Sequence, residues 1–141
     1  MAIQLAIATR NARLDAIETY AGTGAVINVY QLTAGSAVPS ADVAAVPGVV
    51  LASISNPADY FTAASGGSIV KTGTWSDTSA NAAGTADFFR MCKADGTTCV
   101  LQGTMGTATA DMIVDNAVFA AGQTFTVTTF TLTDGNPGVV A

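Results

Sequence analysis

The segment Asp87–Met105 constrains the fold most strongly, because it has the pattern of a β-hairpin in the middle of the chain. Two apolar stretches rich in β-prone residues flank Asp95-Gly96. This dipeptide tolerates the positive φ angles that a tight hairpin turn requires. Alternation along the first stretch places three residues on one face of the strand, namely Phe88, Arg90 and Cys92.

Similar β-prone segments follow Gly22 along the rest of the chain, with turn signals about every eight to twelve residues. This pattern predicts a mainly β protein, with residues 23–141 forming one antiparallel β-sandwich or jelly-roll domain. Besides the hairpin, the expected strands are Val26–Leu32, Val49–Ile54, Ser68–Trp75, Asp111–Phe119 and Thr124–Thr133. The fourth of these is either one strand or a strand that ends in a tight turn at Asp115-Asn116.

The first 22 residues differ in character and predict a single N-terminal helix over residues 3–21. Gly22 is the expected stop signal. Helical spacing places apolar side chains on one face, and we expect this face to be a contact surface formed by Ile3, Ile7, Leu14 and Ile17. Residues 1–22 would then act as a contact arm, assisted by the small-residue loop Thr33–Pro47.

The composition limits the classes of partner. Of the 141 residues, 11% are charged and the net charge is −5, whereas about a quarter of residues are charged in a typical protein. This acidic balance argues against nucleic acid and against anionic membranes. The longest apolar run, Val43–Ala52, is broken by Pro47-Gly48 and is too short to span a bilayer. A low charge suits a subunit that is covered in an assembly.

The residues that usually carry catalysis are sparse. The sequence has no histidine, which removes the most common general base and metal ligand. Asp111 and Asp115 lie four residues apart, but no stretch has the ligand spacing of a calcium loop. We therefore expect no catalytic residues, no metal and no cofactor.

Two further groups leave alternatives open. Cys92 and Cys99 lie on opposite strands of the hairpin and could form a disulfide, or they could remain reduced thiols. Tyr60, Phe61 and Trp75 could form an aromatic platform for sugars, as in a carbohydrate-binding module, or they could pack in the core.

Several segments resemble small virion structural proteins of tailed bacteriophages. They are Thr9–Thr19, Ala64–Ser68, Gly73–Trp75, Phe89-Arg90, Gly96-Thr97, Gln102–Thr104 and Ala121–Val127. Together they extend over most of the chain, and they correspond to turns and strand ends.

The resemblance implies a non-enzymatic virion component that is made in the host cytoplasm. The first expectation is a decoration, or cement, protein on the capsid surface that bridges major capsid protein subunits. Such a protein would also contact copies of itself, for example as a trimer. The alternatives are a tail, neck or baseplate β-sandwich, a carbohydrate-binding module, or a small glycoside-cleaving enzyme.

Overall fold

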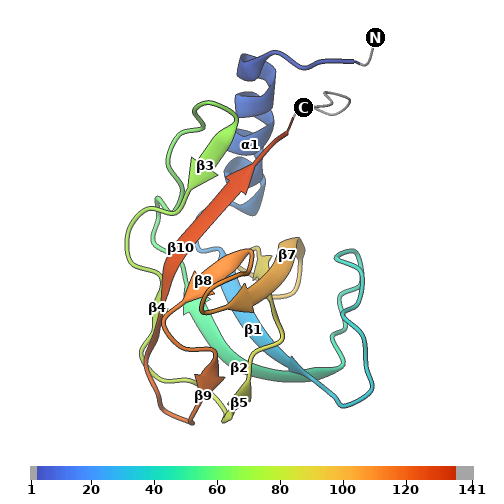
Figure 1. Ribbon diagram of the computed structural model, residues 1–141, viewed down its shortest axis with the longest axis vertical. Coiled ribbons are helices and arrows are strands. Elements are labelled where there is room, and N and C mark those ends of the chain that lie inside the picture. Colours follow the sequence, from blue (N-terminus) through green and yellow to red (C-terminus); the bar gives the residue numbers. More distant parts are fainter. Residues whose placement is uncertain (1–2, 136–141) are drawn as a thin grey trace.

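The computed structural model describes residues 3–135 and shows a mainly β protein with one N-terminal helix (Figure 1). The predicted β-sandwich-like fold class is confirmed. Residues 1–2 and 136–141 belong to the predicted segments 1–22 and 23–141 but lie outside the described residues. The elements are α1 (Ile7–Ala21), β1 (Val26–Leu32), β2 (Gly48–Ser55), β3 (Ser68–Val70), β4 (Ser76–Asp77), β5 (Gly84–Thr85), β6 (Phe88–Cys92), β7 (Cys99–Gly106), β8 (Met112–Val114), β9 (Val118–Phe119) and β10 (Phe125–Thr133).

The main sheet has the strand order β2-β1-β6-β7-β8-β10-β3, with β4 also paired to β10 and with β5 and β9 forming a separate ribbon. The pairs are antiparallel except for β7 and β8, which run parallel. The sheet curls until β4 approaches β2. There the Ser53 N–H donates to the Asp77 carboxylate (3.0 Å), and the Asn81 N–H donates to the Leu51 carbonyl (2.7 Å). These bonds cover part of the β2 edge, where free backbone groups would invite another strand.

An aromatic cluster fills the core enclosed by the sheet. Tyr60, Phe61 and Trp75 are at most 2% exposed, and the rings of Phe61 and Trp75 both lie within 6 Å of the Phe130 ring. Their polar atoms are satisfied inside the protein: the Tyr60 hydroxyl donates to the Gly22 carbonyl, and the Trp75 indole donates to the Thr72 carbonyl. The aromatic sugar-binding platform, one of the two alternatives for these residues, is therefore wrong, because their rings are core.

The predicted central hairpin is present as β6 and β7. In its turn Gly96 has a φ angle of 71°. The Asp95 carboxylate accepts the N–H groups of Thr97 and Thr98, each at 2.8 Å, and the Thr98 hydroxyl. The bonds from Thr98 lower the pKa of Asp95 from 3.8 to about 2. The carboxylate thus stabilises the turn at neutral pH, and this contribution is lost as the pH falls from 3.8 towards 2.

Helix α1 begins at Ile7, later than predicted, and ends at Ala21. It is capped by Gly22, the predicted stop signal, whose N–H donates to the Glu18 carbonyl (2.9 Å). Polar side chains of the helix dock it on the segment between β2 and β3. Asn11 Oδ1 accepts the Gly67 N–H (2.8 Å), and Asp15 Oδ1 accepts the Ala64 N–H (2.9 Å). One turn further along, Glu18 Oε1 accepts the N–H groups of Tyr60 and Phe61, both at 3.4 Å. The helix therefore supplies acceptors for four backbone N–H groups of this segment. The Val70 carbonyl of β3 accepts a fifth, from Thr62 (2.9 Å).

We expect replacement of Asp15 to loosen this docking. Asp15→Ala should lower the free energy of unfolding by about 1–2 kcal/mol, because the Ala64 N–H loses its charged acceptor. Asp15→Asn should lose less, since the amide oxygen can still accept. Thr19→Ala is the matched control, because the Thr19 hydroxyl donates to the Asp15 carbonyl within the helix and not to the connecting segment. Urea unfolding measures all three variants, and equal losses for Asp15→Ala and Thr19→Ala would contradict the docking role.

Candidate functional site

The N-terminal end of α1 is one of two exposed apolar regions that the sequence predicted as contacts. Ile3, which precedes the helix, is 80% exposed, and Ile7, its first residue, is 52% exposed. Leu14 is only 3% exposed. Ile17 is half-buried and packs against the core. The four predicted interface residues therefore do not share one exposed face, because the inner pair anchors the helix to the sheet. Of the four, Ile3 and Ile7 are the ones exposed enough to meet a partner.

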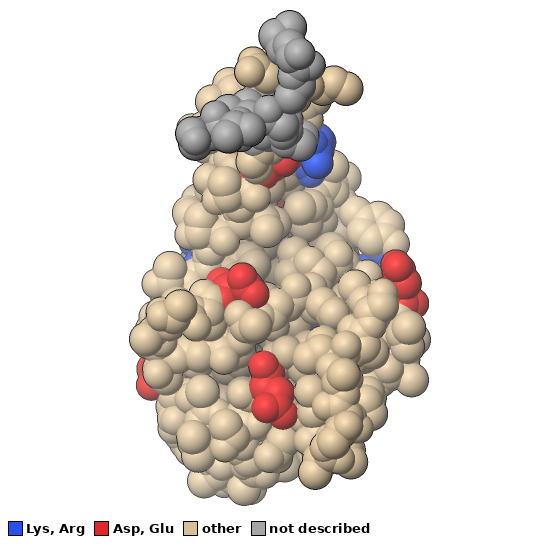
Figure 2. Space-filling model, turned by 45° about the vertical axis from the view of Figure 1, so that its right-hand side comes forward, with Lys and Arg blue, Asp and Glu red and all other residues tan. Residues whose placement is uncertain are grey.

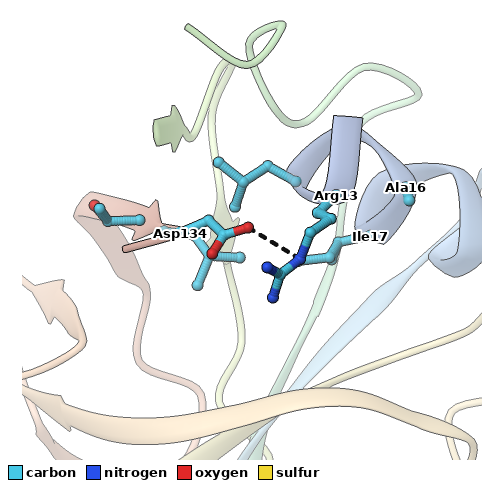
Figure 3. Close-up of a pocket in the computed structure, with 7 residues that line it drawn as sticks. Arg13, Ala16, Ile17 and Asp134 are labelled. Atoms are coloured by element: carbon cyan, nitrogen blue, oxygen red, sulfur yellow. Dashed lines mark ion pairs between the residues drawn. The ribbon is translucent and has the colours of Figure 1, made fainter. Parts of the chain in front are cut away.

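An open apolar groove of about 430 Å³ lies between α1 and the end of β10 (Figure 3). Arg13 crosses its rim, and Arg13 Nε lies 3.2 Å from Asp134 Oδ2. The Arg13 side chain is 56% exposed, so this ion pair contributes at most about 1 kcal/mol and can rearrange around a ligand. The groove is lined by Arg13, Leu14, Ala16, Ile17, Leu132, Thr133 and Asp134.

The segment Thr33–Pro47, hereafter loop 33–47, is the second exposed apolar region. It joins β1 to β2 and projects from the side of the sheet, away from the N-terminal end of α1 (Figure 1). Val38 and Val43 are each 46% exposed, and Asp42 is the one charged residue of the loop. At its base the Thr33 N–H donates to the Pro47 carbonyl (3.0 Å). A hydrogen bond thus joins the two ends of the loop, and the loop presents small apolar side chains to solvent.

Arg90 fastens the middle of loop 33–47 to the outer face of β6. Its guanidinium donates from Nη1 to the Val43 carbonyl (2.6 Å) and from Nη2 to the Ser40 carbonyl (2.9 Å). Its Nε donates to Gln102 Oε1 (2.8 Å), and Gln102 Nε2 in turn donates to the Pro39 carbonyl (2.8 Å). Arg90 is 1% exposed, and within residues 3–135 it makes no ion pair with a carboxylate. Neutral oxygens alone therefore stabilise its buried charge.

Sequence reasoning missed this anchor. Alternation places Arg90 on one face of its strand but assigns it no partner. The local signal is that Arg90 alternates with Phe88 and Cys92, both apolar, in a strand without other charges. The apolar side chains on such a face must be shielded from water, and loop 33–47 packs over them.

Charge is sparse and scattered on the surface. On the face that Figure 2 shows, a few small acidic and basic groups lie among wide uncharged areas. Two carboxylates that the sequence singled out have structural partners: Asp111 Oδ2 accepts the Thr104 N–H (2.8 Å), and Asp115 Oδ1 accepts the Thr126 N–H (2.9 Å). Such a surface offers apolar and neutral hydrogen-bonding contacts rather than a charged recognition patch.

Cys92 and Cys99 lie opposite each other on β6 and β7. Both are free thiols in the structure, Cys92 buried and Cys99 half-buried. The disulfide, one of the two alternatives for this pair, stays a prediction, but the hairpin register brings the two residues together as expected.

Among residues 3–135, no group of three or more His, Cys, Asp or Glu side chains is arranged to hold a metal ion. In the same range, no helix has the length and apolarity needed to cross a bilayer. No family model matches the chain, and comparisons with curated proteins and with solved structures find no significant match.

Proposed function

We propose that this protein is a non-enzymatic structural component of a tailed-bacteriophage particle, and specifically a decoration protein that binds the major capsid protein. The observation that carries the proposal is loop 33–47, an anchored loop with Val38 and Val43 exposed and one charged residue. Apolar side chains held in place on a sparsely charged surface favour a protein partner. The resemblance of several sequence segments to phage virion proteins supports the same class of function.

The proposed mechanism is attachment at two separated places. Loop 33–47 would contact one capsid subunit, and the end of α1 with Ile3 and Ile7 would contact another. The groove beside Arg13 could receive an apolar side chain from the second subunit. Each contact can be small, because joining two weak contacts on one rigid body multiplies their effect. A tail, neck or baseplate location is the alternative within the same class.

Binding to particles assembled without this chain tests the proposal. The double variant Val38→Asp/Val43→Asp should bind such particles at least about tenfold more weakly than the wild type, because it places two charges in the contact. Ile7→Asp should weaken binding at the other end. Val118→Asp is the matched control, since Val118 is 61% exposed on β9, away from both regions. Equal binding by the double variant and the control would contradict the role of loop 33–47.

A further inference from the structure

The hairpin register makes Cys92 and Cys99 direct partners on neighbouring strands. Both are free thiols, and Cys99 Sγ donates to the Leu101 carbonyl (3.5 Å). In the β6–β7 ladder the two residues lie next to a bulge that leaves Val100 unpaired. The neighbouring Lys93 N–H donates to the Thr98 carbonyl (3.0 Å). Cys92 and Cys99 therefore form the adjacent non-hydrogen-bonded pair, for which the Cα separation is about 4.5 Å. Disulfides span Cα separations of roughly 4.4–6.8 Å.

The two thiols differ in access. Cys92 is 1% exposed. Cys99 is half-buried and lines an open pocket of about 350 Å³ between the end of α1, loop 33–47 and the hairpin turn. The pocket has a polar lining that includes Tyr20, Asp42 and Thr98. A small molecule can therefore approach Cys99 from solvent, whereas the buried Cys92 does not line this pocket.

We propose that Cys92 and Cys99 form a two-thiol oxidation site, in which Cys99 reacts with a low-molecular-weight disulfide in this pocket and Cys92 completes an intramolecular disulfide. In the first step the Cys99 thiolate attacks one sulfur of the small disulfide, forms a mixed disulfide and releases one small thiolate. In the second step the Cys92 thiolate attacks the Cys99 sulfur of the mixed disulfide and releases the second small thiolate. The two protein thiols are oxidised, the small disulfide is reduced, and the two protons pass to the released thiolates. This chemistry does not depend on capsid binding.

The surroundings make the reaction slow at neutral pH. Burial, and then the neighbouring Cys99, raise the pKa of Cys92 to about 11. Burial also raises the pKa of Cys99, with Asp42 adding to the effect and the Arg90 guanidinium opposing it. Tyr30 and Asp95 are the other titratable groups that interact with the pair. Since the thiolate is the attacking form, the rate should rise as the pH increases from 7 to 10.

Intact-mass spectrometry of the full chain tests the proposal, with bis(2-hydroxyethyl) disulfide as a small uncharged probe at pH 9. The wild type should lose two hydrogen atoms and keep no adduct. Cys92→Ser should accumulate one mixed disulfide at Cys99, because the second thiol is missing. Cys99→Ser should remain unmodified for at least about ten times longer, because Cys92 is buried. In denaturant both single variants should react alike.

Two results would overturn the proposal. One is a folded wild type that ends unmodified or as a mixed disulfide, without a bond between Cys92 and Cys99 in the peptide map. The other is equal reaction of the two folded serine variants. The wild-type measurement decides the first result even if a variant fails to fold.

Discussion

Replacing Phe130 by alanine is expected to lower the free energy of unfolding by about 3–5 kcal/mol. Phe130 is 3% exposed and lies within the aromatic cluster of the core. Its ring centroid lies 5.6 Å from Trp75, 5.8 Å from Phe61 and 5.7 Å from Phe89. Truncation leaves a cavity that these large rings cannot easily fill. Denaturant unfolding followed by the fluorescence of Trp75, the single tryptophan, measures the loss.

Tyr20→Ala is the matched control for this prediction. Tyr20 is also aromatic but 56% exposed, and its ring contacts the ammonium group of Lys93 at 3.8 Å. Its truncation should cost about 1 kcal/mol or less. If Phe130→Ala lost no more stability than Tyr20→Ala, the aromatic cluster would not be the main core of the protein.

The second large loss of stability is expected when Arg90 is replaced. Arg90→Met keeps much of the side-chain volume but removes the bonds to Ser40, Val43 and Gln102. We expect the free energy of unfolding to fall by about 2–4 kcal/mol, since hydrogen bonds to a charged donor are among the stronger ones. Loop 33–47 should also detach from the sheet while the core stays folded. Elastase, which cleaves after small residues, should then cut within the loop at least about tenfold faster.

Arg13→Met is the control for this experiment. Arg13 is also an arginine, but it is 56% exposed and makes a surface ion pair with Asp134. It should change stability by less than about 1 kcal/mol and leave loop cleavage unchanged. Loop cleavage at the wild-type rate in Arg90→Met would show that the guanidinium does not hold the loop.

The strands could largely be predicted from the sequence because alternation and turn residues act locally. The hairpin of β6 and β7 follows from Asp95-Gly96, and β10 follows from an alternating run. The predicted strand Ser68–Trp75 is too long, since the chain leaves β3 after Val70 and turns at Gly73, which has a φ angle of 71°. For Asp111–Phe119 the alternative with a turn at Asp115-Asn116 agrees with the structure, since β8 ends at Val114 and β9 begins at Val118. Local patterns locate strands well but show their ends less reliably.

The candidate contact regions were harder to predict because they depend on pairs far apart in the sequence. Arg90 bonds to residues 47 and 50 positions earlier. Its alternation with apolar residues indicates that its face is covered, but no local pattern identifies the covering segment. The sequence predicts that helix α1 docks or binds through a stripe of isoleucine and leucine. Leu14 and Ile17 do pack the helix on the core as that stripe predicts. The sequence did not predict the polar docking by Asn11, Asp15 and Glu18, which accept backbone N–H groups of the connecting segment. Ile7 lies on the exposed N-terminal turn beyond this docking.

The copy number of this chain in purified phage particles tests the proposed decoration role most directly. Quantitative mass spectrometry would give its molar ratio to the major capsid protein. A decoration protein requires a ratio near one or a simple fraction such as about one half or one third, because it repeats with the symmetry of the shell. A ratio of a few per cent would contradict decoration and favour the tail or neck. Absence from the particle would contradict the virion function altogether.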